Sequence, residues 1–285
     1  MGHRFPMSKY ELLYRQLLHE GTLEEANFFD PGMPEDTDLL AVHTPDYVQA
    51  LKALSIDKAM IRRIGFPLSE KLVEREHLIT QGTIMGAQKA LETGIALNIA
   101  GGTHHAFTDR GEAFCLFNDQ AVAARALQKR GLVKKVLIVD LDVHQGNGTA
   151  QIFAEDESVF TFSMHGEKNY PFQKEKSDLD IELPDGTADT AYLSILKRTL
   201  PELLEKVQPD FVFYLSGVDI VATDKLGRLG CSPEGCAQRD RFVLETIGNL
   251  KIPLQVSMGG GYSPHIKTII DAHANTYRIA QELFG

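Results

Sequence analysis

The feature that most constrains the fold of this chain is a set of five short apolar runs, each too short to form a helix. The runs are rich in aliphatic and β-branched residues and lack polar alternation, as expected of strands buried on both faces. Helical patterns over Asp119–Lys129, Tyr192–Val207 and Pro233–Leu250 lie between most of them. This alternation predicts an α/β fold with a central, mostly parallel sheet flanked by helices. The five runs are Ala96–Ala100, Val136–Val139, Val159–Phe162, Phe211–Leu215 and Pro253–Val256.

The amino-terminal part of the chain reads as mainly helical. Apolar residues recur at helical spacing over Ser8–His19, with Ser8 as the N-cap, and Gly21 ends this segment. The segment Asn27–Asp38 is rich in Pro, Gly and Asp and predicts a loop. Further helices are predicted over Asp46–Leu54 and Leu78–Glu92. We find no repeat, low-complexity tract or linker, so residues 1–285 are predicted to form one domain.

Polar residues of metal-binding or catalytic type follow all five apolar runs. Open parallel sheets bind their ligands at the carboxyl ends of the strands. The sequence therefore predicts one functional site at that edge of the sheet. The strings that follow the runs are Gly-Gly-Thr-His-His, Asp-Leu-Asp-Val-His, Ser-Met-His-Gly, Ser-Gly-Val-Asp and Ser-Met-Gly-Gly-Gly-Tyr.

Asp142 and His144 are the core of the predicted metal site. Residues two apart in an extended segment point to the same side, so both side chains can bind one ion. Asp140 precedes them by two residues, and buried acids at a strand end are costly unless they are paired or bind a metal. Asp219, after the fourth run, is the best third ligand for a four-coordinate Zn²⁺. The alternatives are that Asp142 caps a turn and that Asp219 caps a helix.

Two further strand ends carry catalytic candidates. His104 and His105 follow a Gly-Gly turn that allows close approach of a substrate, and one of them can accept a proton while the other supplies charge. Tyr262 follows three glycines and can donate a hydrogen bond to an oxyanion. A packed pair of histidines and an ordinary glycine-rich turn are the alternatives. Ser163, after the third run, is a weaker candidate for holding a monovalent cation.

Composition limits the classes of function. The chain carries 39 acidic and 29 basic residues, a formal net charge of −10, which argues against nucleic-acid binding by charge. An acidic surface is compatible with basic, lysine-bearing substrates. Three cysteines form no disulfide framework or CxxC pair, and no apolar stretch approaches 18 residues. We therefore expect a cytoplasmic protein with no membrane span; oligomeric state is left open.

Six strings of the sequence resemble motifs of the histone deacetylase superfamily, which has the arginase/deacetylase fold. The strings are GGTHHAF, FCLFND, VDLDVHQGNGTA, FSMHG, SGVDI and GGGY, and they occur in the family's order and spacing. The similarity runs from about His43 to about Tyr262. The strings DRGEAFCLFND and DVHQGNG are most similar to class IV histone deacetylases and their bacterial relatives.

The resemblance implies a role for each matching residue. The implied zinc ligands are Asp142, His144 and Asp219. His104 and His105 match the tandem histidines, with His105 the general base and then the general acid. Tyr262 matches the tyrosine that polarises the scissile carbonyl.

The resemblance also implies supporting residues. Asp140 matches the acid that hydrogen-bonds the first histidine. Phe114 and Tyr170 match positions that line a narrow tunnel for an acyl-lysine. A structural K⁺ site is implied at Asp140, Asp142, His144, Ser163 and Met164.

The chain departs from the family pattern at three places. Asn147 stands where class I members have an acid opposite the second histidine, so His105 should keep a lower pKa and stay neutral. Ala113 occupies a tunnel position that is often glycine. Gly2-His3-Arg4-Phe5-Pro6 resembles a motif that a strand normally precedes, so we expect that edge strand to be lacking or replaced.

The predicted reaction is zinc-dependent hydrolysis of an N-acyl-lysine amide in a peptide or protein. Fe²⁺ is an alternative metal, because it shares these ligands. The main alternative function is an amidohydrolase for acetylpolyamines or other small N-acyl amines, which Leu226 disfavours because a polyamine-selective relative has Glu there. An arginase-like two-metal site is disfavoured because no Asp lies two residues after Asp219. A non-catalytic acyl-lysine binding protein is the remote alternative.

Overall fold

The computed structural model describes residues 4–285, and in this part of the chain six parallel strands form one sheet. Every neighbouring pair is parallel, so the predicted α/β architecture is confirmed. The strand order is β1-β6-β5-β2-β3-β4. The strands are β1 (Ile95–Asn98), β2 (Val136–Asp140), β3 (Val159–Gly166), β4 (Leu179–Leu183), β5 (Phe211–Leu215) and β6 (Leu254–Ser257).

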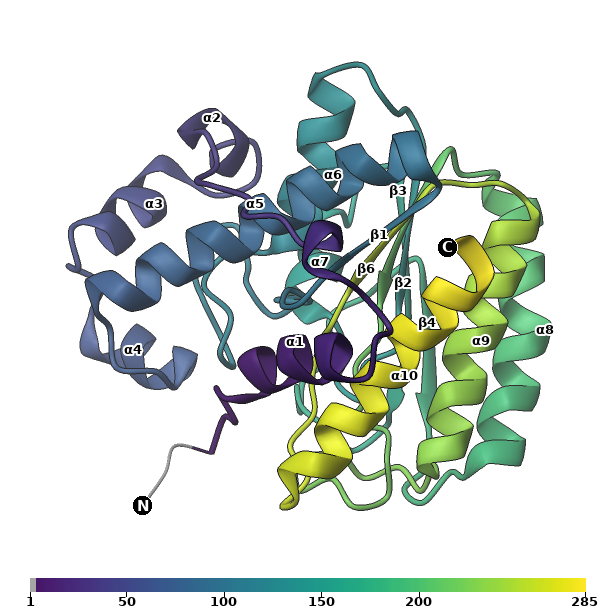
Figure 1. Ribbon diagram of the computed structural model, residues 1–285. Helices are drawn as coiled ribbons and strands as arrows, with labels where there is room; N and C mark the ends of the chain where they lie inside the picture. Colours follow the sequence, from purple (N-terminus) through teal and green to yellow (C-terminus); the bar gives the residue numbers. More distant parts are fainter. Residues whose placement is uncertain (1–3) are drawn as a thin grey trace.

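Helices cover both faces of the sheet, which is why the central strands are apolar without alternation (Figure 1). Val136 and Ile138 of β2 pack into the core under α5 (Glu70–Thr93) and α6 (Asp119–Lys129). The intervening Leu137 and Val139 pack into the opposite core. That second core lies under α8 (Asp189–Val207), α9 (Pro233–Asn249) and α10 (Ile266–Phe284).

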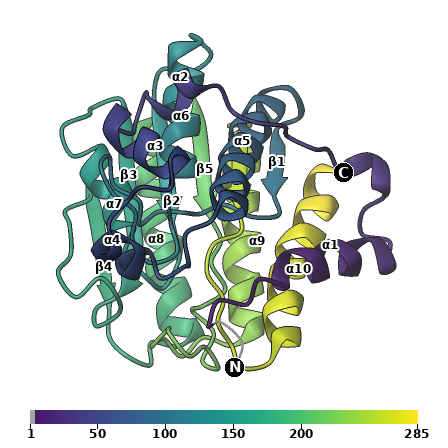
Figure 2. The ribbon, with the colours of Figure 1, turned by 90° about the vertical axis from the view of Figure 1, so that its left-hand side faces the viewer.

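The remaining helices surround these layers. Figure 2 shows α1 (Lys9–His19) lying along α10, at the side of the sheet where β1 is the edge. Leu13 and Leu17 of α1 are fully buried in that contact. The others are the 3-10 helix η1 (Glu25–Asn27), α2 (Asp36–Leu39), α3 (Pro45–Lys52), α4 (Lys58–Ile64) and α7 (Asn147–Ile152).

Capping residues set several helix boundaries. The Ser69 hydroxyl accepts the Leu72 N–H, so α5 begins at Glu70, well before the predicted Leu78. Gly94 ends this helix with a positive φ of 87°. Asn118 caps α6 in the same way by accepting the Ala121 N–H.

Several elements differ from the prediction, and helices α4, α7 and α10 were not predicted. The predicted loop Asn27–Asp38 ends in the short helix α2, and β4 was not predicted at all. β4 is an edge strand whose Asp180 and Glu182 alternate with apolar residues, so it lacks a buried apolar run. Strand β3 continues to Gly166 because its second half pairs with β4.

Among residues 4–285, no strand pairs with the outer edge of β1. A groove of about 340 Å³ runs there, lined by Leu23, Phe28, Tyr277 and Phe284 together with β1. Gly2 and His3 of the motif noted above lie outside the described residues. The three cysteines are buried and unpaired, and no helix in the described part of the chain is long and apolar enough to span a membrane.

Candidate active site

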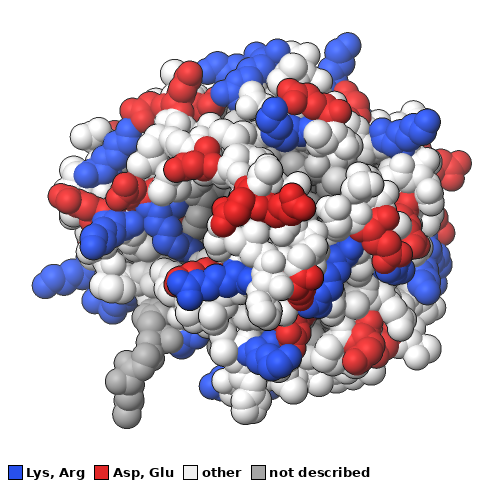
Figure 3. All heavy atoms as spheres, in the orientation of Figure 1, with Lys and Arg blue, Asp and Glu red and all other residues white. Residues whose placement is uncertain are grey.

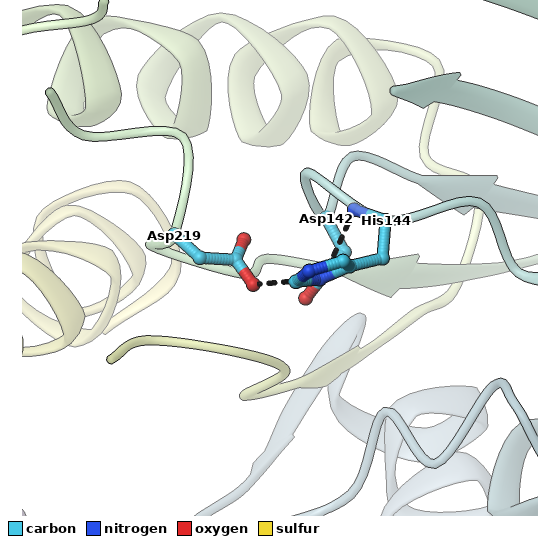
Figure 4. Close-up of side chains that lie close together, drawn as sticks. All are labelled: Asp142, His144 and Asp219. Carbon is cyan, nitrogen blue, oxygen red and sulfur yellow. Dashed lines mark hydrogen bonds and ion pairs between the residues drawn. The ribbon is translucent and has the colours of Figure 1, made fainter. Parts of the chain in front are cut away.

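The predicted site residues meet at the carboxyl ends of β1, β6, β5 and β2. Because β6, β5 and β2 are neighbours in the sheet, the loops after them bring Tyr262, Asp219 and the segment Asp142–His144 together. His104 and His105 arrive from the loop after β1. Figure 4 shows Asp142 and His144 from one loop facing Asp219 from another.

Asp142, His144 and Asp219 form a buried group whose ligand atoms all lie within 4.8 Å of one another. The His144 Nδ1 atom lies 2.9 Å from Asp142 Oδ1 and 3.3 Å from Asp219 Oδ2. Two carboxylate oxygens and one imidazole nitrogen match the donor set of a catalytic Zn²⁺ site, which leaves a position for water and substrate. Among the described residues, this is the one group of three or more such side chains that can share an ion.

Backbone hydrogen bonds position the two carboxylates at this centre but leave one of their oxygens without a hydrogen bond from any described residue. Asp219 Oδ1 accepts the Val143 N–H, whereas Asp219 Oδ2 is buried and accepts no hydrogen bond from the described residues. Asp142 Oδ2 accepts the Gly260 N–H. A Cβ atom at Gly260 would lie 2.0 Å from Asp219 Oδ2, so only glycine fits there. This buried oxygen accepts no hydrogen bond within residues 4–285 and lies beside two other possible metal ligands. A bound cation would satisfy it.

The electrostatics of the group also favour a cation. Burial and the neighbouring Asp142 carboxylate raise the pKa of Asp219 to about 7. Burial alone would lower the pKa of His144, but its contacts with the Asp142 and Asp219 carboxylates raise it to about 10. Two neighbouring buried carboxylates are unfavourable unless positive charge neutralises them. A divalent ion can supply that charge in place of protons. The residues fit the metal that the sequence predicts.

The tandem histidines have different partners. His104 Nδ1 lies 2.6 Å from Asp140 Oδ2, and His105 Nδ1 lies 2.6 Å from Asn147 Oδ1. Burial opposes charge on His104, but Asp140 outweighs it and raises the pKa of His104. Burial, reinforced by the charges of His104 and His144, holds the pKa of His105 well below its ordinary value. His105 is therefore the neutral member of the pair.

Tyr262 completes the centre from the loop after β6. Its ring lies 6.4 Å from that of His144 in an edge-to-face arrangement, and its backbone N–H donates to Asp224. Burial and the carboxylates of Asp142 and Asp219 raise the pKa of the Tyr262 phenol well above its usual range. The phenol therefore keeps its proton and can donate a hydrogen bond.

An open cavity of about 520 Å³ leads from the surface to His105, His144 and Tyr262. The predicted tunnel residues Phe114, Tyr170 and Leu226 all line it. Ala113 also lines it, and its positive φ of 42° explains why glycine is favoured at this position. The backbone there is held by the Ala113 N–H, which donates to the Arg63 carbonyl.

The residues predicted to hold K⁺ are close in the sheet. Ser163 pairs in register with Asp140, and the Asp142 N–H donates to Asp140 Oδ1. The Ser163 hydroxyl contacts His165 Nδ1 at 2.9 Å. Met164 is fully buried in the core beside them. This placement is compatible with the predicted site, which stays a prediction.

Sequence reasoning missed two supporting residues. Lys9 is fully buried in α1, and its Nζ atom donates to the carbonyl of Gly259 in the loop that carries Tyr262. A signal was present, because Lys9 lies four residues before Leu13 on the apolar face of its helix. Asp224, which accepts the Tyr262 N–H, lies in an irregular loop with no periodic signal.

With this geometry in place, comparison with known proteins decides the family. A model of the histone deacetylase domain matches residues 3–277. The chain belongs to the histone deacetylase family. Histone deacetylase 2 of Arabidopsis thaliana is 33% identical over 287 residues, which cover 97% of this chain and 74% of that protein.

Two further similarities agree. An uncharacterized protein of Picosynechococcus is 46% identical over 282 residues, covering 99% of this chain and 94% of that protein. The crystal structure of a histone deacetylase homolog from Aquifex aeolicus matches with a TM-score of 0.79 at 25% identity, over 94% of this chain and 76% of that one. The family and its fold are confirmed; the resemblance to class IV stays a prediction.

Proposed function

We propose that this protein is a zinc-dependent amidohydrolase that removes the acyl group from the side-chain amide of an acyl-lysine. One observation carries the proposal. The buried donor set of Asp142, His144 and Asp219 lies beside His105 and Tyr262 at the inner end of an open cavity. Zn²⁺ bound to this set supplies a Lewis acid that polarises a carbonyl and lowers the pKa of water. Membership of the histone deacetylase family supports the same reaction.

The cavity walls suit the extended stem of a lysine side chain. Phe114 and Tyr170 offer aromatic surface, and Leu226 adds an aliphatic contact. The phenol of Tyr170 donates to Glu112, which turns its ring edge-on to His105 at 5.0 Å. Methylene groups gain by leaving water for such a lining. The acyl carbonyl of a stem threaded through it would end beside His105 and Tyr262.

His105 is the proposed general base. Asn147 Oδ1 accepts a hydrogen bond from the Nδ1–H of His105, which leaves Nε2 as the basic nitrogen. The low pKa of His105 keeps this nitrogen unprotonated and able to accept a proton from the attacking water. The same nitrogen then returns the proton to the leaving amine as the C–N bond breaks.

Tyr262 and His104 are the proposed electrostatic partners. The protonated phenol of Tyr262 donates a hydrogen bond to the carbonyl oxygen as negative charge develops on it. His104, charged through its contact with Asp140, lies with its ring 4.1 Å from that of His105. Its positive charge disfavours protonation of His105 in the resting site.

The finer assignments belong to the same proposal. Asn147 supports placement near class IV, because the amide replaces the acid of class I. The cation beside Asp140 and Ser163 is proposed to be K⁺, and Fe²⁺ is the alternative ion at the main site. A cytoplasmic location is proposed from the three unpaired cysteines.

The test is turnover of an acetyl-lysine peptide before and after treatment with a chelator. We expect the chelator to abolish turnover and added Zn²⁺ to restore it, with Fe²⁺ compared in parallel under anaerobic conditions. Long-chain acyl-lysine peptides and acetylspermidine, assayed side by side, distinguish the alternative substrates. Turnover that survives complete metal removal, or none on any acyl substrate with Zn²⁺ present, would refute the proposal.

A further inference from the structure

The mouth of the active-site cavity carries charge opposite to that of the whole molecule. The chain has 39 acidic and 29 basic residues. Yet within residues 4–285 no Asp or Glu lines the cavity, whereas several basic residues do. They are Arg4, Arg63, Lys168, Lys225 and Arg228, and we call them the basic rim. On the face drawn in Figure 3, acidic and basic side chains are interspersed.

Most of this positive charge is not neutralised by the protein. In the described part of the chain, no ion pair involves Arg4, Lys168 or Lys225, and all three side chains are exposed. The Nε atom of Arg228 lies 3.4 Å from Oδ2 of Asp185. The Nη1 atom of Arg63 lies 3.8 Å from Oε1 of Glu112, a longer contact. The Arg228 pair is exposed on both sides and such pairs are weak, and the Arg63 side chain is 52% exposed, so both guanidinium groups stay accessible to a ligand.

Two acids next to residues that line the mouth already have partners. Glu112 is 12% exposed, accepts the Tyr170 hydroxyl and pairs with Arg110 at 3.2 Å. Asp224 accepts three backbone N–H groups, from Leu226, Gly227 and Tyr262. Neither carboxylate is free to attract a cationic substrate.

The basic rim is spread rather than focused on one point. Arg4 precedes α1, Arg63 lies in α4, Lys168 follows β3, and Lys225 and Arg228 lie in the loop after β5. Phe172, which also lines the mouth, is 90% exposed. A single small anion would contact only part of such a surface. An extended chain with several negative charges and some apolar contact would use all of it.

We infer that the substrate is an acyl-lysine flanked by acidic residues in a polypeptide. The inference rests on the proposed deacylase function and adds the chemical class of its substrate. Acidic flanks gain from the rim both in steering and in the bound complex. Basic tails and polyamines meet like charge at the mouth, so the overall charge of −10, which is compatible with basic substrates, misleads about this site.

The first experiment compares three peptides that share one central acetyl-lysine and differ only in two flanking residues on each side. The flanks are Glu, Gln or Arg. We expect kcat/KM to fall in the order Glu, Gln, Arg, with a span of about tenfold or more at low salt, as several opposed charges predict. The span should shrink at about 1 M salt, where the Debye length is roughly 3 Å. Equal values for the three peptides, or a preference for Arg, would overturn the inference while leaving the deacylase function standing.

A second experiment assigns the preference to the basic rim. The triple variant Lys168→Gln, Lys225→Gln and Arg228→Gln should bring the Glu-to-Arg ratio of kcat/KM close to one. The matched control is Lys129→Gln, Lys134→Gln and Arg198→Gln, which removes the same three charges from exposed positions that do not line the cavity. The control should keep the wild-type ratio. An unchanged ratio in the rim variant would contradict the assignment.

Two further measurements separate the possible outcomes. The three peptides are labelled with a fluorophore, and their binding to the Tyr262→Phe variant is measured by fluorescence anisotropy. This measurement reports the charge preference without turnover. A preference for Glu flanks in binding supports the inference even when turnover fails, and no such preference overturns it. A small N-acetyl amine that carries one carboxylate tests whether charge suffices without a chain; a higher kcat/KM than the Glu peptide would overturn the polypeptide part.

Discussion

Replacing Tyr262 by Phe removes one hydroxyl from the inner end of the cavity and keeps the ring. If the phenol donates to the developing oxyanion, kcat should fall by about 10²–10³. The backbone N–H of Tyr262 still donates to Asp224, so the loop should keep its position. Steady-state kinetics with the acetyl-lysine peptide, with zinc content measured in parallel, checks this. Activity close to wild type at equal zinc content would remove Tyr262 from the mechanism.

Asn147→Asp replaces the amide opposite His105 by a carboxylate. A carboxylate stabilises the imidazolium form, so the pKa of His105 should rise. Because the neutral form acts as the base, the acid limb of the kcat/KM profile should move to higher pH, and activity at pH 6 should fall relative to pH 8. Asn249→Asp makes the same change at an exposed position of α9 and should leave the limb in place. A limb that stays or moves down would contradict the role given to Asn147.

At the scale of elements, α9 holds the ends of two strands through Arg239. This side chain is fully buried and donates to the carbonyls of Leu141, Ser216 and Gly217, just before the metal-ligand positions after β2 and β5. Asp240 pairs with the guanidinium at 2.8 Å. Arg239→Met leaves the Asp240 carboxylate buried without its partner, so we expect about 3–5 kcal/mol of lost stability in urea unfolding.

Two variants control for this result. Arg239→Met combined with Asp240→Asn removes both charges and should recover part of the loss, since the Tyr214 and Thr276 hydroxyls can still bond an amide. Arg241→Met removes an exposed arginine of the same helix that pairs with Glu282, and should change stability far less. Equal losses for Arg239→Met and Arg241→Met would show that the buried pair does not hold this region.

For the whole molecule, His43 should make stability depend on pH. Its Nδ1–H donates to the Phe107 carbonyl and its Nε2 accepts the Asn118 N–H, so the ring is neutral. Burial lowers the pKa of His43 from 6.5 to about 4. The unfolded chain therefore binds the proton more tightly between these values, and stability is present above 6.5 and lost as pH falls toward 4. The loss is about 3 kcal/mol at 1.36 kcal/mol per pKa unit.

The measurement is urea unfolding of wild type and His43→Gln at pH 7 and pH 4.5. The variant should be less stable at pH 7, and the difference from wild type should shrink at pH 4.5. His19→Gln, which changes an exposed histidine at the end of α1, should show no such dependence. A difference that does not vary with pH would mean that His43 is not held in its neutral form.

The elements that the sequence predicted best are those with one strong local signal. Strand β5 and helix α6 have the predicted bounds, because β5 is apolar on both faces and α6 begins at a capping Asn118. The start of α5 and the edge strand β4 were missed. β4 is mostly half exposed and alternates in polarity, and the first turns of α5 bury the polar Glu76 and His77, so neither segment carries a continuous apolar pattern.

Local features of the chain were enough to predict the parallel sheet and the metal-ligand set, because strand ends and a spacing of two residues are local properties. Asp142 and His144 had to share one side, and Asp219 had to emerge at the same edge. Tertiary structure alone decided what surrounds them. Lys9 reaches the loop of Tyr262 across 250 positions, and the basic rim gathers residues from four separate segments. Such contacts depend on how distant loops pack, which no local pattern encodes.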